Sequence, residues 1–476
     1  MMKQAILFFI FHFSFFIQVS PAQDYSLSKK DTAEVRTINK KKFYVYKVEK
    51  GETVYSLCRK FSVTEAELQE YNPGLKDGLK NKMKLWIPAV NPGAMTVPAE
   101  EKKTEAGPQV SSLEVALLLP LRTDKQYVTE DLLSDTLLLS EGLERETAAS
   151  LEFYEGVLYS LDELAKSKKI KVKLRVYDTQ DDSAVTAKLL KSAALQKSDV
   201  WIASGSNVLL KLISQASKQQ KMPLLSASMS SAEIFKDNPG AVALLPSSLT
   251  QCREMGKACS RLFQGMQCIL INTAVAKENE RNKSFKAGWL AEEKSAAVRE
   301  ITLGNGKESA LPDSLSTVRQ NVVFIPSSNE DFVSTLMAAL DKAAPEKKFI
   351  VVGIPTWQYF ETIDPSLMEK LNTYLFATSY IDYENAEALL FRKHFRESYG
   401  NEPSDHAYQG FDVMRVLGNT WLVNGKDFPG SIDKEEYKGL FTDYHFETNH
   451  GMHENNFIQV VRYKDLNLEK VDAFTK

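Results

Sequence analysis

Apolar segments and amphipathic segments alternate from Leu113 to about Phe474, and this alternation limits the possible fold more than any other feature of the chain. Residues 115–119 form a continuous apolar run, which is typical of a strand buried on both faces of a parallel sheet. The alternation predicts an α/β fold with parallel sheets and right-handed crossovers. Since the region exceeds the roughly 250–300 residues at which one core stops growing, two lobes are expected. Further strands are expected at 172–177, 200–203, 223–225, 268–272, 322–325 and 349–352, and helices at 151–164, 184–196 and 208–219.

The N-terminus has the composition of a secretory signal peptide. Lys3 supplies a positive charge, residues 5–19 form a short apolar segment, and Ser20 and Ala22 offer a cleavage site. Residues 1–22 are therefore expected to be a signal peptide, which places the mature protein in the periplasm or cell envelope; an uncleaved membrane anchor is the alternative. No Cys ends the apolar segment, so a lipid-modified N-terminus is not expected.

A compact segment at 43–88 lies between a polar arm at 23–42 and a linker at 89–112 that is rich in Pro, Glu, Lys and Ala. Its pattern predicts a strand, two helices and a second strand. Thr53 is placed to cap the first helix, and Thr64 and Glu67 form a capping box for the second.

The order and spacing of residues in this segment resemble a LysM domain. The matching positions are Tyr46, Val48, Gly51, Glu52, Thr53, Tyr55, Leu57, Asn72, Pro73, Leu85, Ile87 and Pro88. The resemblance implies carbohydrate binding, with the N-acetylglucosamine-containing glycan of peptidoglycan held in a shallow groove between two loops. The glycan-binding residues that it implies are Gly51, Glu52, Thr53, Val54, Asn72, Pro73, Gly74 and Leu75; the alternative is that they only build turns. Lys82 stands where the family often has Gly. A single copy indicates weak binding, which suits a tether.

Residues 113–476 resemble the type I periplasmic binding fold, the bilobal receptor of branched-chain amino-acid transporters. The resemblance rests on the order of several short motifs, at 177–182, 202–206, 222–228, 395–403 and 407–412. The whole chain is thus expected to combine a small βααβ LysM module with a bilobal domain of parallel sheets.

The resemblance implies a small amino-acid-like ligand at the carboxyl ends of the strands. The ligand-binding residues that it implies are Ser206, Asn207, Ser226, Ser228 and Ser230. Three departures put the amino-acid site in doubt: Leu209 replaces a hydroxyl, 274–279 replaces a Tyr-Gly turn, and the loop at 121–151 is long. Two functions therefore stay open, a tethered protein that binds or senses a small ligand, and a ligand-free scaffold that docks onto or regulates peptidoglycan-synthesis or other envelope machinery.

The sequence indicates neither an enzyme nor a nucleic-acid-binding protein. The net charge is -3 and the basic residues are dispersed. No catalytic motif, metal-ligand motif or cofactor-binding loop is found, and the spacing of His445, His450 and His453 does not favour a metal site. The acidic pair at 181–182 is interpreted as a solvated turn or lobe contact. A disulfide between Cys259 and Cys268 is possible, but buried thiols are favoured for them and for Cys252.

Overall fold

The computed structural model describes residues 35–38, 41–49, 111–123, 145–166, 169–303, 306–434 and 436–473, together with 57, 60, 61, 63, 68, 71, 72, 74, 75, 79, 80 and 82–88. The chain divides into two compact units, Met1–Glu105 and Ala106–Lys476. The predicted signal peptide at 1–22 and nearly all of the linker at 89–112 lie outside the described residues.

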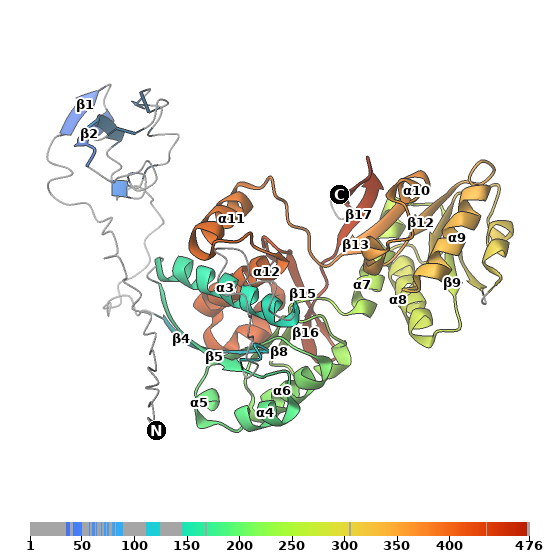
Figure 1. The fold of residues 1–476 in the computed structure, drawn as a ribbon, viewed down its shortest axis with the longest axis horizontal. Helices are drawn as coiled ribbons and strands as arrows, with labels where there is room; N and C mark the ends of the chain where they lie inside the picture. Colours follow the sequence, from blue (N-terminus) through green and yellow to red (C-terminus); the bar gives the residue numbers. More distant parts are fainter. Residues whose placement is uncertain are drawn as a thin grey trace, which may run out of the picture. The chain divides into compact units, whose positions relative to one another are not determined.

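The N-terminal unit contains a three-stranded antiparallel sheet in the order β1 (Val35–Ile38), β2 (Lys41–Lys47), β3 (Lys84–Pro88) (Figure 1). β1 lies in the segment expected to be a polar arm, so one strand more is present than the pattern predicts. β2 and β3 pair Tyr46 with Leu85 and Tyr44 with Ile87. One face of the sheet is thereby buried, and its side chains join a core with residues between the strands, namely Leu57, Phe61, Val63, Leu68 and Leu75.

The first lobe of the larger unit is built on an eight-stranded sheet of the described residues, in the order β14-β15-β16-β8-β7-β6-β4-β5. Along β4, Val115 and Leu117 belong to one core and Ala116 and Leu118 to another, because helices cover both faces of the sheet (Figure 1). This double burial explains the continuous apolar run. The strands are β4 (Ser111–Leu119), β5 (Ile170–Asp178), β6 (Val200–Ala203), β7 (Leu224–Ser226), β8 (Ala241–Ala243), β14 (Glu436–Tyr437), β15 (Tyr444–Asn449) and β16 (Met452–Asn455).

Helices α3 (Arg145–Lys166) and α12 (Asp405–Asn424) pack on one face of this sheet, and α4 (Ser183–Leu189), α5 (Ala193–Gln196) and α6 (Asn207–Gln220) lie on the other. The single helix predicted at 184–196 is two helices, because Ser192 caps a new helix by accepting a hydrogen bond from the Leu195 amide.

The second lobe has a seven-stranded sheet of the described residues, in the order β10-β9-β11-β12-β13-β17-β18. The predicted strands here are confirmed, and β9 to β13 are parallel. The strands are β9 (Gln267–Asn272), β10 (Val298–Thr302), β11 (Asn321–Phe324), β12 (Phe349–Val352), β13 (Thr373–Ala377), β17 (Gln459–Lys464) and β18 (Asn467–Val471). The helices of this lobe are α7 (Ser248–Leu262), α8 (Ala276–Glu292), α9 (Glu330–Ala343) and α10 (Pro365–Lys370).

Both sheets are mixed rather than wholly parallel, because the C-terminal segments add antiparallel strands to each. β17 pairs antiparallel with β13, and β15 pairs antiparallel with β16. The chain passes between the lobes after β8, after β13 and after β16. The second passage leads into α11 (Ala386–Tyr399), which packs with α12 in the first lobe.

Cys252, Cys259 and Cys268 are free and buried, so the buried-thiol interpretation is confirmed. Burial raises the pKa of the Cys252 thiol to about 12. No helix in the described part of the chain combines the length and apolar character needed to cross a membrane.

Candidate ligand site in the first lobe

A cavity of about 270 Å³ opens at the carboxyl ends of β4, β6 and β7. The loops after these strands form one side of it, and the first turns of α3 and α12 form the other. Its volume lies just under the roughly 300–1,000 Å³ of drug-sized ligand sites, so it fits a smaller molecule. The described lining residues are Pro120, Glu146, Ala149, Ser150, Phe153, Asp181, Ser204, Gly205, Ser206, Ser228, His406 and Gln409.

Serine hydroxyls after β6 and β7 are bonded to one another. The Ser228 hydroxyl accepts a hydrogen bond from the Gly205 amide at 3.0 Å and lies 2.9 Å from the Ser204 hydroxyl. Ser206 is the N-cap residue of α6, but its side chain makes no capping hydrogen bond. The two loops are thus held together through Ser228, one of the residues that the sequence assigned to a ligand.

A charged wall is formed by Arg122, Glu146 and Asp181. The Arg122 guanidinium lies 2.9 Å from a Glu146 carboxylate oxygen and 3.3 Å from Asp181 Oδ2. The other oxygen, Asp181 Oδ1, is buried and has no hydrogen-bond partner. Arg122 and Asp181 both have positive φ, at 50° each, a conformation that non-glycine residues seldom adopt.

Asp178 at the end of β5 holds these two loops in place. Its carboxylate accepts hydrogen bonds from the amides of Leu121, Arg122, Thr123 and Gln180, and from the Thr123 hydroxyl. Burial raises the pKa of Asp178, but the hydrogen bonds from Thr123, Gln180 and Arg122 outweigh burial and hold the pKa below its ordinary value. The carboxylate therefore stays ionised and fixes the left-handed turns that carry Arg122 and Asp181.

α12 contributes Gln409 and His406 to the opposite wall. Gln409 is 6% exposed, and its Nε2 donates to the Ala227 carbonyl at 2.6 Å. That bond fixes the orientation of the amide, since only the nitrogen can donate to a carbonyl. His406 is exposed in the first turn of the helix.

The five ligand residues predicted from the sequence are placed differently from one another. Ser206 and Ser228 line the cavity. Asn207 is exposed as the first residue of α6, Ser226 is wholly buried in β7, and Ser230 is half-buried; none of these three is among the described lining residues. Sequence reasoning did not assign Glu146, Asp181, His406 or Gln409 to the site. From the sequence, the acidic pair that contains Asp181 is interpreted as a solvated turn or lobe contact. Its carboxylate was the only sequence feature that could have indicated a role in the site.

The predicted glycan residues can be followed only in part, because 51–54 and Pro73 lie outside the described residues. The Asn72 side chain is buried and bonded internally, with Nδ2 donating to the Leu68 and Trp86 carbonyls and Oδ1 accepting from the Trp86 amide. Leu75 is in the core of the unit and Gly74 is exposed. The Asn72 side chain therefore joins the loop to β3, and Gly74 is the described residue of the three that faces solvent.

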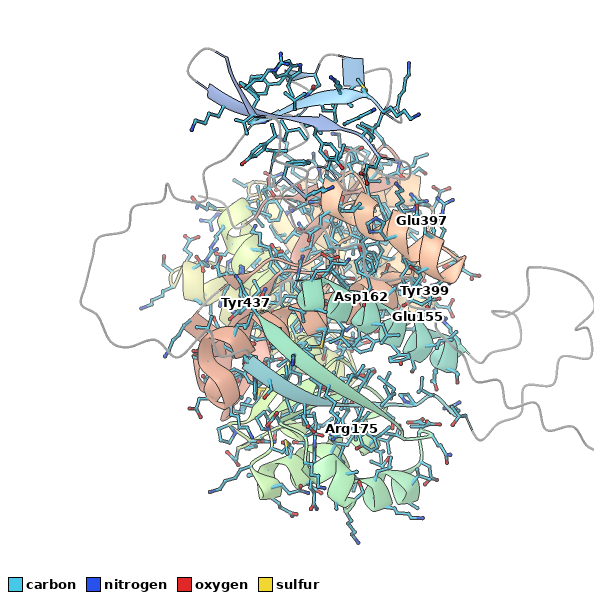
Figure 2. All side chains as sticks on the ribbon, turned by 90° about the vertical axis from the view of Figure 1, so that its left-hand side faces the viewer. Glu155, Asp162, Arg175, Glu397, Tyr399 and Tyr437 are labelled. Atoms are coloured by element: carbon cyan, nitrogen blue, oxygen red, sulfur yellow. The ribbon has the colours of Figure 1, made fainter. Side chains whose placement is uncertain are left out.

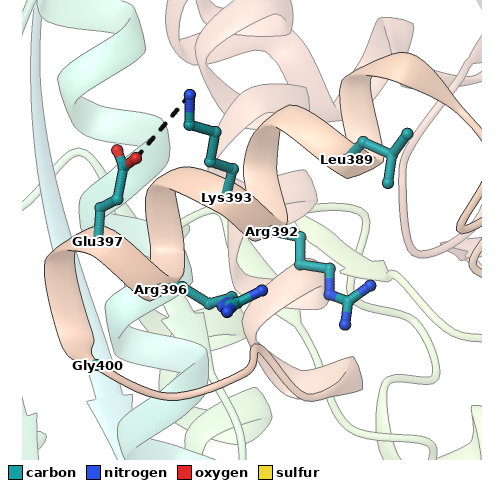
Figure 3. A pocket seen from close by; sticks show the side chains of 6 residues that line it. All are labelled: Leu389, Arg392, Lys393, Arg396, Glu397 and Gly400. Atoms are coloured by element: carbon teal, nitrogen blue, oxygen red, sulfur yellow. Dashed lines mark ion pairs between the residues drawn. The ribbon is translucent and has the colours of Figure 1, made fainter.

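Two other hollows are larger but less suited to a ligand. One of about 540 Å³ lies along α11, where Leu389, Arg392, Lys393, Arg396 and Glu397 share one side of the helix with Gly400 after it (Figure 3). Its charges are already paired, since Arg392 and Arg396 contact Glu402, and Lys393 lies 4.0 Å from Glu397. The other, of about 370 Å³, includes Arg415 and Gln459. No group of three metal-ligating side chains occurs in the described part of the chain.

Two lobes of mostly parallel sheet, three passages between them, and a polar cavity at the strand ends of one lobe define the bilobal class of solute-binding proteins. A model of the periplasmic binding protein family matches residues 149–421, and the chain belongs to this family. Its members are typically non-catalytic. A LysM domain model matches residues 46–88. The sequence has no match among curated proteins.

Solved structures share the fold of the larger unit. A putative branched-chain amino acid ABC transporter protein from Rhodospirillum rubrum has 14% identity, with 76% of this chain and 100% of that chain covered and a TM-score of 0.56. A branched-chain amino acid transporter protein from Rhodopseudomonas palustris CGA009 has 13% identity, 76% and 96% coverage and a TM-score of 0.53. An ABC transporter substrate-binding protein from Desulfitobacterium hafniense, in complex with Leu, has 14% identity, 76% and 100% coverage and a TM-score of 0.50.

Proposed function

We propose that this protein is a non-enzymatic binding protein of the cell envelope, which its LysM domain holds on peptidoglycan while the first lobe binds a small polar ligand. Export by the predicted signal peptide at 1–22 would deliver it there. The observation that carries the proposal is the cavity of about 270 Å³ at the strand ends of the first lobe. Ligands of α/β folds bind in this position, outside the carboxyl ends of parallel strands.

The polar groups of this cavity support a ligand of about amino-acid size. Hydroxyl, carboxylate, imidazole and amide side chains converge from separate loops and helices, while Phe153 and Ala149 supply apolar contact. A related structure from Desulfitobacterium hafniense is a complex with Leu, which makes amino acids the first ligands to test.

Thermal unfolding of the purified protein with amino acids and muropeptide fragments tests ligand binding. A ligand present at 100 times its Kd stabilises the folded state by about 2.7 kcal/mol, which raises the unfolding temperature measurably. Ala149→Phe fills the cavity and is expected to abolish the shift. Ala148→Phe is the matched control, because Ala148 is half-buried on the same turn of α3 but does not line the cavity.

The scaffold hypothesis makes the opposite prediction in the same experiment. No compound would stabilise the protein, and pull-down from envelope extracts would recover a wall-synthesis partner that Ala149→Phe still binds. A ligand shift that Ala149→Phe leaves unchanged would place the binding site elsewhere.

Sedimentation with purified peptidoglycan tests the tether. The protein is expected to pellet with the wall, and N-acetylglucosamine oligomers should release it, because LysM domains bind this glycan through shallow, weak contacts. Gly74→Phe adds bulk at an exposed position and should reduce pelleting, whereas Lys80→Phe places the same aromatic ring at another exposed position and should not. Pelleting that the oligomers fail to compete would contradict glycan recognition.

A further inference from the structure

Carboxylate and amide oxygens line the cavity in the first lobe, together with the Ser206 hydroxyl, which makes no capping hydrogen bond. Asp181 Oδ1 is buried without a hydrogen-bond partner. Gln409 Nε2 donates one of its two N–H groups to the Ala227 carbonyl, so the amide offers its carbonyl oxygen and one N–H to a bound molecule. Gln409 lines the cavity and is 6% exposed, so its amide group lies in a nearly closed environment.

One backbone donor that a carboxylate could use is already bonded. The Gly205 amide, at the loop after β6, donates to the Ser228 hydroxyl, and that hydroxyl is also bonded to Ser204. A carboxylate would have to displace the Ser228 hydroxyl before it could accept from the Gly205 amide.

The charged side chains on the cavity wall also favour a cationic ligand group. Two carboxylates, Glu146 and Asp181, line the cavity, whereas the Arg122 guanidinium that bridges them is not among the described lining residues. Among the described residues, one guanidinium faces two carboxylates, so the described part of this wall has a net negative charge. Of the described lining residues, His406 is the remaining titratable one, and it is exposed in the first turn of α12.

We propose that the first-lobe cavity binds the ligand through a cationic amine, which donates to Asp181 Oδ1 and to the Gln409 carbonyl oxygen, and that a ligand carboxylate is not required. This inference rests on the proposed small-ligand function and specifies its chemistry. It assigns the main polar contacts to Asp181 and Gln409 rather than to the serines that the resemblance implies.

Matched probes separate the two ligand groups. For the side chains of alanine, leucine and phenylalanine, the full-length protein is titrated calorimetrically with the amino acid, with its carboxamide, and with the acid that lacks the amine. The carboxamide keeps the ammonium group and the acid keeps only the carboxylate. At least one carboxamide is expected to bind as tightly as its amino acid or more tightly, and the amine-free acids are expected to give no heat of binding.

Asp181→Asn keeps the shape of the cavity and removes one charge, so amine affinity is expected to fall at least 10-fold. Asp182→Asn is the matched control: Asp182 caps α4 outside the described cavity lining, and Asn retains the capping function, so affinity should change less than 2-fold.

The outcomes separate this inference from the proposed function. Binding of an amine-free acid without binding of any carboxamide would overturn the inference and leave the small-ligand function standing. Amine binding that Asp181→Asn weakens no more than Asp182→Asn would also overturn it. If no probe and no amino acid binds, the proposed function fails and the inference fails with it.

Discussion

Gly156 is the position where the packing of the first lobe is most sensitive to a single carbon atom. It lies where α3 crosses α12, and a Cβ added to it would stand 1.9 Å from the Ala407 carbonyl oxygen. Gly410 on α12 is in the reciprocal position, because its Cβ would lie 2.0 Å from the Phe153 carbonyl oxygen. Both contacts are with backbone atoms, so no side-chain rotation can relieve them. Gly156→Ala must therefore push the two helices apart.

The expected loss in the free energy of unfolding follows from the separation of the two helices. Ordinary Cβ contacts begin near 3.4 Å, so the helices must separate by roughly 1–1.5 Å, and the Phe153 and Val157 contacts in the core loosen with them. Overpacking of this kind costs about 1–3 kcal/mol, and lost contacts add to it. Ala stabilises a helix interior by about 1 kcal/mol relative to Gly, which offsets part of the cost. The expected net destabilisation is about 2 kcal/mol.

Urea unfolding of the purified protein, followed by far-UV circular dichroism, measures this difference. Gly430→Ala is the control, because Gly430 is exposed, has no positive φ, and its added Cβ would meet nothing within 4 Å. That variant should remain within about 0.5 kcal/mol of the parent, as surface substitutions usually do. If Gly156→Ala is as stable as the parent or more stable, the helix crossing is not as close as described and the reasoning fails.

Three further predictions concern other contacts. Glu155→Gln should raise the unfolding temperature at pH 8 but not at pH 4.5. Burial first, and Glu152 second, raise the pKa of Glu155 to about 7 beside Tyr399 (Figure 2), so any stabilising contribution of the protonated carboxyl is complete below the unfolded pKa near 4.5 and is lost as pH rises through 7. Equal shifts of the unfolding temperature at both pH values would contradict this reasoning. Glu454→Ala should lower the free energy of unfolding in urea by about 2–4 kcal/mol, because the buried carboxylate accepts hydrogen bonds from the Ser247 amide and the Thr250 hydroxyl at the start of α7. A loss below about 1 kcal/mol would show that these donors find other partners. Asn72→Asp should abolish sedimentation with peptidoglycan, because a carboxylate cannot donate to the Leu68 and Trp86 carbonyls and the loop loses its attachment to β3. Unchanged sedimentation together with an unchanged unfolding temperature would refute the role of these hydrogen bonds.

The sequence predicts those parts of the fold that depend on local pattern. β4, β6, β9, β11 and β12 fall where apolar runs stand, because a strand covered by helices on both faces must be apolar throughout. The antiparallel strands β15 and β17 were harder to assign to a sheet, since their partners are set by the passages between the lobes rather than by nearby residues. β1 was missed because a four-residue edge strand of mixed polarity has little periodicity of its own.

The candidate site was predicted less well than the fold, and the reason is physical. Ser206 and Ser228 follow strands directly, so the rule that ligands bind at strand ends finds them. Glu146 and Gln409 reach the same cavity from two helices, α3 and α12, whose first residues are 260 positions apart in the sequence (145 and 405). No local pattern brings such residues together.

Whether a hydroxyl is available to a ligand also depends on tertiary structure. A serine after a strand indicates a possible donor to a carboxylate, but Ser228 is bonded to the Gly205 amide and to Ser204 in the folded protein. Residue type therefore predicts that the position is polar, whereas its hydrogen-bond partners decide which ligand group it can bind. Among the described lining residues, Asp181 Oδ1 is the buried side-chain oxygen that lacks a hydrogen-bond partner, and the proposed amine follows from this acceptor rather than from Ser228.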